Sequence, residues 1–112
     1  MDELFLALGT ALASICGADF EEARVRADLF EGHTSIEYAC KRHGQWIEGI
    51  DSGADDNFAV YFALQQIKTD MGNSWNRCVF TFDSSCKFRF DTELVENPLD
   101  RDDLKGAFGG KP

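Results

Sequence analysis

The sequence predicts an α+β domain in which two helices pack on one face of a mainly antiparallel sheet. The expected order is helix, three strands, helix, two strands. Apolar residues recur at helical spacing in residues 4–16 and again in residues 54–71. Residues 20–50 and 75–93 instead alternate between apolar and polar side chains, as strands with one buried face do. Two helices and one sheet are most simply packed as two layers around one core.

The length and composition fit one domain with a substantial core. The chain has 112 residues, of which 44% are hydrophobic and ten are Phe. We expect residues 1–93 to form a single domain and residues 94–112 to form an acidic, Gly-containing tail. Because such a chain can offset its conformational entropy by burying apolar surface, we expect it to fold without a metal or a cofactor.

Residues 4–16, LFLALGTALASIC, are expected to form a core helix that ends at Gly17. Its apolar positions recur every three or four residues: Leu4, Leu8, Leu12 and Ile15. The segment also resembles the apolar centre of a secretion leader, but Asp2 and Glu3 stand where a leader carries positive charge. It is also shorter than the roughly 20 residues that span a bilayer. We therefore expect neither a leader nor a membrane span.

Residues 20–30 fit two structures, because their apolar side chains match a helical face as well as the alternation of a strand. The turn at residues 31–33 and the alternating pattern in residues 35–40 favour two antiparallel strands. A break at residues 43–45 then precedes a short third strand at residues 46–50. The first half of the chain is therefore expected to be a helix followed by three strands.

The second half is expected to be a helix followed by a β-hairpin. The helix starts with a capping box at residues 52–55 and stops near Gly72. Its apolar stripe contains Val60, Leu64, Ile67 and Met71. Residues 75–93, WNRCVFTFDSSCKFRFDTE, alternate on both sides of a polar break. The polar break at residues 83–86 is expected to form the turn of this hairpin.

The four cysteines, Cys16, Cys40, Cys78 and Cys86, are expected to be reduced thiols in the cytoplasm. Disulfides persist mainly in oxidising compartments, where these residues could form two of them. Cys40 and His43 have the spacing of half a zinc site, but the other two cysteines provide no matching second half. We therefore expect no metal site.

The charge balance is the strongest clue to partners. The chain carries 20 acidic and 11 basic residues, a formal net charge of −9. Contacts with a nucleic-acid backbone need a positive surface, so direct binding of DNA or RNA is disfavoured. A basic protein partner is favoured, because complementary charge speeds association and selects partners.

Three segments together resemble the YezG-like immunity proteins, which are antidotes to polymorphic and contact-dependent growth inhibition toxins. They are FEEARVRADLFEG at residues 20–32, SIEYACKRHGQWIEGI at residues 35–50, and WNRCVFTFDSSCKFRFD at residues 75–91. The resemblance covers residues 2–93, with departures at Cys86, where the family usually has Gly, and at Thr92, where an aromatic residue is common. It therefore implies a left-handed backbone at Cys86, at a cost of roughly 1 kcal/mol relative to Gly. It implies a cytoplasmic, non-catalytic protein that binds and neutralises a cognate toxin domain, often a basic nuclease.

Two groups of acidic residues are the candidate contacts with such a partner. The first lies at the expected junction between the third strand and the second helix: Glu48, Asp51, Asp55 and Asp56. The second follows the last strand: Asp91, Glu93, Glu96, Asp100, Asp102 and Asp103. The alternative for either group is a solvated rim with no binding role.

Two other function classes stay open. An acidic nucleic-acid mimic or adaptor would occupy a host protein that binds DNA or RNA. A small enzyme would use His33 or His43 in acid–base chemistry, but both histidines lie in expected turns, where a solvated side chain is common. We therefore expect no catalytic residue. Trp46 and Trp75 are expected to pack in the sheet rather than to anchor a partner.

Overall fold

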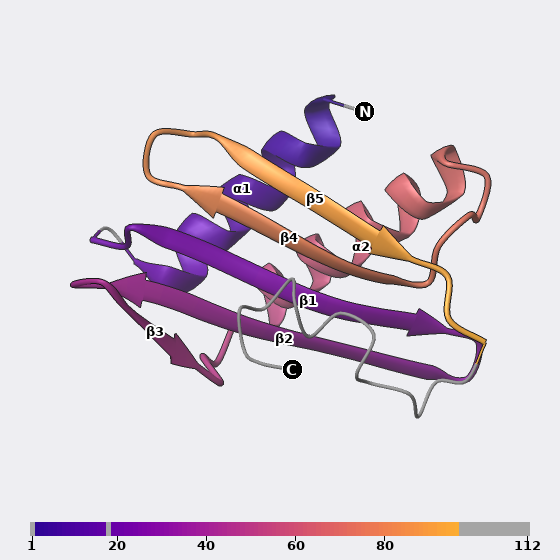
Figure 1. Cartoon of the computed structure of the whole chain (residues 1–112), viewed down its shortest axis with the longest axis horizontal. Helices are drawn as coiled ribbons and strands as arrows, with labels where there is room; N and C mark the ends of the chain where they lie inside the picture. The colour runs from indigo at the N-terminus through magenta and orange to yellow at the C-terminus, as the bar shows by residue number, and fades with distance from the viewer. Residues whose placement is uncertain (1, 18, 97–112) are drawn as a thin grey trace.

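The computed structural model describes residues 2–17 and 19–96, which form the two layers shown in Figure 1. A five-stranded antiparallel sheet in this part of the chain carries both helices on one face. The elements in chain order are α1 (Asp2–Cys16), β1 (Glu22–Phe30), β2 (His33–Arg42), β3 (Gln45–Glu48), α2 (Ala54–Asp70), β4 (Arg77–Asp83) and β5 (Phe88–Glu93). The predicted α+β class and element order are confirmed.

The strand β1 lies at the centre of the sheet, whose order is β3-β2-β1-β4-β5. Every neighbouring pair is antiparallel, and Val25 of β1 stands opposite Tyr38 of β2 on one side and Phe80 of β4 on the other. The helix α2 carries the chain from the edge strand β3 to β4, beside β1. The two halves of the chain therefore share one sheet, and the second half completes the core that the first begins.

The core lies between the sheet and the two helices. Alternate residues of the strands face this layer and are buried: Ala23, Val25, Ala27, Leu29, Tyr38, Cys40, Cys78, Phe80 and Phe82. The helices contribute Leu8, Ala11, Leu12, Val60, Ala63, Leu64 and Ile67. Trp75 is buried and meets Phe90 edge to face, with the ring centroids 5.5 Å apart. The predicted packing role of Trp75 is therefore confirmed.

The helix α1 packs directly against the sheet, as the prediction of a core helix requires. A Cβ atom added at Gly9 would lie 2.6 Å from the Phe82 ring, so this glycine allows the helix its close approach to β4. The helix ends at Gly17, which has φ +84° and donates its N–H to the carbonyl of Ala13 at 2.9 Å. None of the helices in the described residues has the length and apolar character needed to cross a membrane.

The prediction of a capping box at the start of α2 is wrong. The N-cap residue is Gly53, one position later than the predicted Ser52, and no side chain caps the helix there. The first turn closes through the N–H of Asn57, which donates to the carbonyl of Gly53 at 3.0 Å. Asp55 and Asp56 in this turn still interact favourably with the positive end of the helix dipole.

A disulfide joins Cys16 at the end of α1 to Cys40 in β2, so the expectation of reduced thiols is wrong for this pair. Their Cα atoms are 5.8 Å apart. Arg42, also in β2, donates a hydrogen bond to the carbonyl of Cys16, so this strand holds the end of α1 by two contacts. Cys78 and Cys86 are free thiols, the first buried and the second exposed.

Protein unfolded without reductant should therefore show two reactive thiols rather than four, measured with a thiol-reactive chromophore. Reduction should lower the free energy of unfolding by about 2–4 kcal/mol, because the bond closes a loop between residues 24 positions apart in the sequence. A Cys16→Ala/Cys40→Ala variant should lose its sensitivity to reductant, whereas Cys78→Ala should keep it. Four reactive thiols in the oxidised protein would contradict the disulfide.

The turn of the β4–β5 hairpin is organised by Asp83. Its Oδ1 atom accepts hydrogen bonds from the N–H of Lys87 at 2.9 Å, and from the hydroxyl and N–H of Ser85 at 2.8 and 2.9 Å. These donors, the Lys87 N–H first, hold the pKa of Asp83 below its ordinary value. Cys86 follows with φ +69°, which confirms its predicted left-handed backbone.

Replacing Cys86 with Gly should stabilise the protein by up to about 1 kcal/mol, since Gly adopts this backbone without steric cost and the added flexibility of the unfolded chain offsets only part of the gain. The midpoint of denaturant unfolding measures the effect. Cys86→Ala is the matched control, because it removes the thiol and keeps the strain. If Cys86→Gly is no more stable than Cys86→Ala, the turn is not strained at this residue.

Candidate functional site

The first acidic group forms one continuous stretch at the junction between β3 and α2, which we call the acidic junction (Glu48, Asp51, Asp55 and Asp56). Glu48 is the last residue of β3, and Asp55 and Asp56 lie in the first turn of α2. Asp51 and Asp55 are exposed, while Asp56 is half-buried. The four residues are therefore neighbours in the chain but not one patch, because Glu48 shares the sheet face opposite the helices with Arg24 while Asp56 contacts α1 on the helix side.

Two members of the acidic junction are tied to other elements. Glu48 pairs with Arg24 of β1 at 2.5 Å, and the Arg24 guanidinium lies 4.4 Å from the centre of the Trp46 ring. Asp56 accepts a hydrogen bond from the Ser14 hydroxyl of α1 at 2.9 Å. Trp46 is accordingly a half-buried packing residue, as predicted. Glu48 and Asp56 fix the junction in place, while Asp51 and Asp55 project from it.

A buried tyrosine anchors the same end of α2 to the sheet. The Tyr38 hydroxyl donates to the side-chain oxygen of Asn57 at 2.6 Å. Burial raises the pKa of Tyr38 to about 12, and the negative charge of Asp56 adds to this effect, while a hydrogen bond with Ser52 opposes it. The Tyr38 hydroxyl is thus a hydrogen-bond donor near neutral pH, and its bond to Asn57 ties the first turn of α2 to β2.

The second acidic group lies across the sheet from the first. Its described members are Asp91 and Glu93 of β5, both half-buried, and the exposed Glu96. Asp100, Asp102 and Asp103 lie outside the described residues. Because β3 and β5 are the two edges of a five-stranded sheet, the groups are roughly 19 Å apart at the spacing of neighbouring strands. They therefore form two surfaces rather than one.

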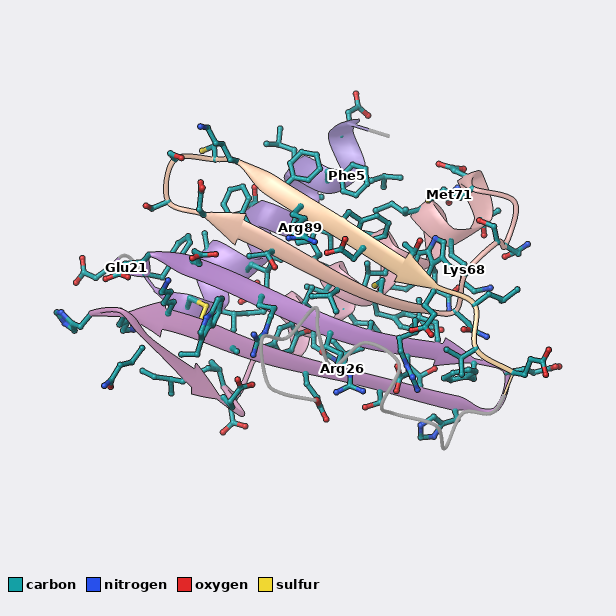
Figure 2. The ribbon with its side chains drawn as sticks, in the orientation of Figure 1. Phe5, Glu21, Arg26, Lys68, Met71 and Arg89 are labelled. Atoms are coloured by element: carbon teal, nitrogen blue, oxygen red, sulfur yellow. A yellow bond between two sulfur atoms is a disulfide. The ribbon has the colours of Figure 1, made fainter. Side chains whose placement is uncertain are left out.

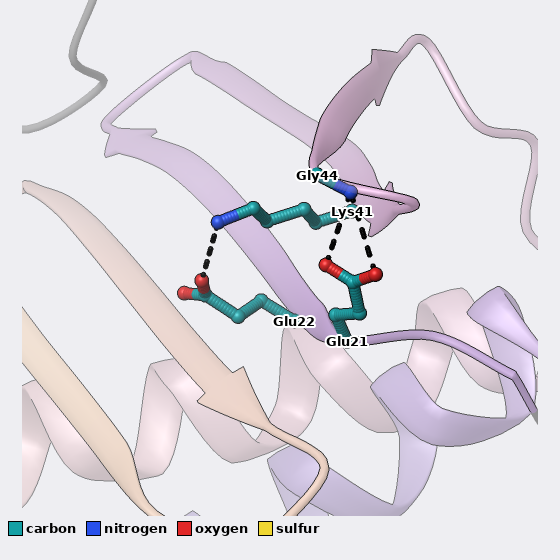
Figure 3. Close-up of polar contacts among 4 residues, drawn as sticks. All are labelled: Glu21, Glu22, Lys41 and Gly44. Carbon is teal, nitrogen blue, oxygen red and sulfur yellow. Dashed lines mark hydrogen bonds and ion pairs between the residues drawn. The ribbon is translucent and has the colours of Figure 1, made fainter.

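The carboxylates of β5 share their sheet face with basic residues. This face, opposite the helices, is called the outer sheet face, and Arg26 and Arg89 lie on it in Figure 2. Arg89 pairs with Asp91 at 2.9 Å. Lys41 pairs with Glu22 at 3.2 Å, and Glu21 nearby accepts the N–H of Gly44, as Figure 3 shows. The outer sheet face thus carries a network of opposite charges, in which Asp91 already has Arg89 as a basic partner.

One pair on the outer sheet face is fully buried. Arg77 of β4 donates to Asp28 of β1 at 2.8 Å, and the exposed fractions of the two side chains are 0% and 1%. The residues are direct partners in the strand register. This pair was not predicted, because its only signal in the sequence is two charged residues at outward-facing strand positions, and the register that joins them is not visible there.

Replacing Arg77 with Met should lower the free energy of unfolding by about 3–5 kcal/mol, because it leaves the buried Asp28 carboxylate without the guanidinium that faces it. Adding Asp28→Leu to this variant should recover most of the loss, since it removes the uncompensated charge. Denaturant unfolding of the two single variants and the double variant gives the coupling energy. If the loss in the double variant equals the sum of the losses in the two single variants, the pair is not coupled.

The structure argues against the two other kinds of site considered from the sequence, a zinc site and a catalytic histidine. Cys40 is bonded to Cys16, so the half zinc site with His43 lacks a free thiolate. His33 and His43 are both exposed, and His33 begins β2 instead of lying in a turn. Burial raises the pKa of the Cys78 thiol, so this thiol is inert. Residues 2–17 and 19–96 hold no group of three or more side chains placed to bind a metal.

Comparison with models of known protein families and with curated proteins finds no match to this chain. The resemblance to YezG-like immunity proteins therefore stays a prediction. It rests on the segments at residues 20–32, 35–50 and 75–91.

Proposed function

We propose that this chain is an immunity protein that neutralises a basic toxin domain by binding it. The observation that carries the proposal is the acidic junction, where the exposed Asp51 and Asp55 stand at the end of a helix held by the Tyr38–Asn57 hydrogen bond. A helix end held by such contacts loses less conformational entropy when a partner binds than an unattached segment does. It suits a protein that acts by occupying its partner stoichiometrically, without catalysis, cofactor or metal.

Charge supports the same proposal. The helices α1 and α2 together contain five acidic residues and one basic residue, Lys68. A basic partner is attracted to this layer from a distance, which raises its association rate at low ionic strength. A nuclease domain that binds the phosphate backbone carries the positive surface that this layer complements.

The redox state of Cys16 and Cys40 bears on the cellular compartment in which the protein acts. Immunity proteins of this kind are expected in the cytoplasm, where disulfides are rare. The Cys16–Cys40 bond instead favours an oxidising compartment. Counting thiols in protein trapped directly from its native cells decides between the two, and toxin binding at the acidic junction is compatible with both.

The double variant Asp51→Lys/Asp55→Lys should associate with the toxin domain encoded beside this gene at least about tenfold more slowly at low salt, with a weaker salt dependence. Stopped-flow mixing measures the rate, and growth of cells that express the toxin measures protection. The matched control is Glu31→Lys/Glu37→Lys, which makes the same charge change at two exposed carboxylates outside the junction.

Thermal unfolding of each variant should accompany these measurements, because Asp55 also stabilises α2 by about 0.3–1 kcal/mol through the helix dipole. An association rate unchanged in the junction variant would remove this surface from the interface. A toxin that stays fully active with excess wild-type protein would refute the immunity function itself. Capture of a host DNA-binding protein in cells without the toxin gene would favour a nucleic-acid mimic.

A further inference from the structure

An apolar groove runs between α1 and α2. It has a volume of about 580 Å³ and is lined mainly by small or apolar side chains. The lining residues are Glu3, Leu6, Ala7, Thr10, Ala11, Ser14, Asp56 and Ala59. Because the α1 residues recur every three or four positions from Glu3 to Ser14, the groove follows this helix for about 16 Å, or three turns.

Large apolar side chains are exposed in the groove lining and on neighbouring positions of α2. Leu6 in its lining is 66% exposed. On α2, Phe62 lies one turn beyond Ala59 and is 63% exposed, and Phe58, 59% exposed, stacks on it with the ring centroids 5.8 Å apart. Apolar side chains grouped in this way around a concave surface are typical of protein-binding sites. Because Phe58 and Phe62 are exposed, α2 carries apolar side chains on its solvent side as well as on its buried side.

The charges at the groove are acidic. Glu3 lines the groove near the start of α1, and Asp56 lines it beside Ser14, with which it forms the hydrogen bond at 2.9 Å. Carboxylates therefore lie near both ends of an apolar middle section. No Lys or Arg occurs in residues 2–16, and Lys68 in the last turn of α2 is the one basic residue of the two helices.

We infer that this groove binds an amphipathic helix of a basic protein partner. An apolar stripe of about three turns would fill the section between Leu6 and Ala59, and Lys or Arg residues about eleven positions apart would reach Glu3 and Asp56. This inference rests on the proposed function, since it names the element of the partner that the helix layer receives. The acidic junction continues into the groove through Asp56, so one partner can contact both.

A second copy of this chain is the poorer occupant. Face-to-face pairing would bring Glu3 and Asp56 of one copy close to the same carboxylates of the other, and each copy has a formal net charge of −9. Like charges at an interface oppose association. Charge complementarity therefore selects a basic helix.

The test uses the full chain and a capped helical peptide of about 18 residues, with Leu along one face and two Lys residues about eleven positions apart. Titration followed by ¹⁵N NMR should shift the amides of Leu6, Ala7, Thr10 and Ala59. The variant Leu6→Ser/Phe62→Ser should bind the peptide about tenfold more weakly or worse. Leu94→Ser is the matched control, because Leu94 is 65% exposed outside the groove, and it should bind like wild type.

A second peptide with Glu in place of both Lys residues should also bind about tenfold more weakly, because it faces the groove carboxylates with like charge. The inference is overturned if the shifts fall on the outer sheet face, if Leu6→Ser/Phe62→Ser binds the Lys peptide like wild type, or if both peptides bind equally. It is also overturned if wild-type protein sediments as a dimer that the double variant converts to a monomer.

The two proposals fail in different ways. If Leu6→Ser/Phe62→Ser still protects cells from the toxin, the immunity function stands and the groove is not part of its interface. If the Lys peptide binds in the groove while wild-type protein gives no protection, the groove is a helix-binding site for another basic protein.

Discussion

The structure depends above all on the pairing of β1 with β4. It joins Asp28 to Arg77, 49 positions apart in the sequence, and it gives the central strand its second neighbour. Closing so long a loop costs entropy before any contact forms, and that cost must be offset by the whole ladder and by the core beneath it. The buried ion pair at one end of this ladder helps to fix its register, because a slip would leave both charges buried without their partners.

The position of the helix layer follows from that pairing. Since α2 lies in the connection between β3 and β4, it must cross the sheet on the side where β1 is apolar. Tyr38 then holds its first turn, while the disulfide and Arg42 hold the end of α1. The groove between the helices and the first turn of α2 are thus both set by contacts with β2, whereas Asp51 lies in the connection between β3 and α2.

Local patterns predicted most of this fold. The alternation in residues 75–93 and the apolar periodicity of residues 4–16 are signals within single elements, and both were confirmed. The left-handed backbone at Cys86 was predicted from the resemblance, because the family usually has Gly at this turn position, and it is observed at φ +69°. The members of the first acidic group lie within nine consecutive residues, but the side of the sheet that each faces could not be predicted from the sequence.

What the sequence could not show is contact between distant segments. Cys16 and Cys40 carry no recognisable spacing, and their bond follows only from the way the end of α1 lies over β2. The register that pairs Asp28 with Arg77 is equally invisible. The predicted start of α2 was wrong for a local reason, because the N-cap residue is Gly53 and not Ser52, which the capping-box pattern indicated.

The two layers divide the charge of the molecule unequally, and this division favours one side for the basic partner that we propose. Five basic residues lie on outward-facing strand positions of the sheet: Arg24, Arg26, Lys41, Arg77 and Arg89. Ion pairs within the sheet, such as Arg89 with Asp91, already compensate much of that charge. The helix layer has Lys68 alone against five acidic residues, and it also carries the exposed Phe58 and Phe62. A basic partner with apolar side chains therefore gains attraction and buried surface together on the helix side.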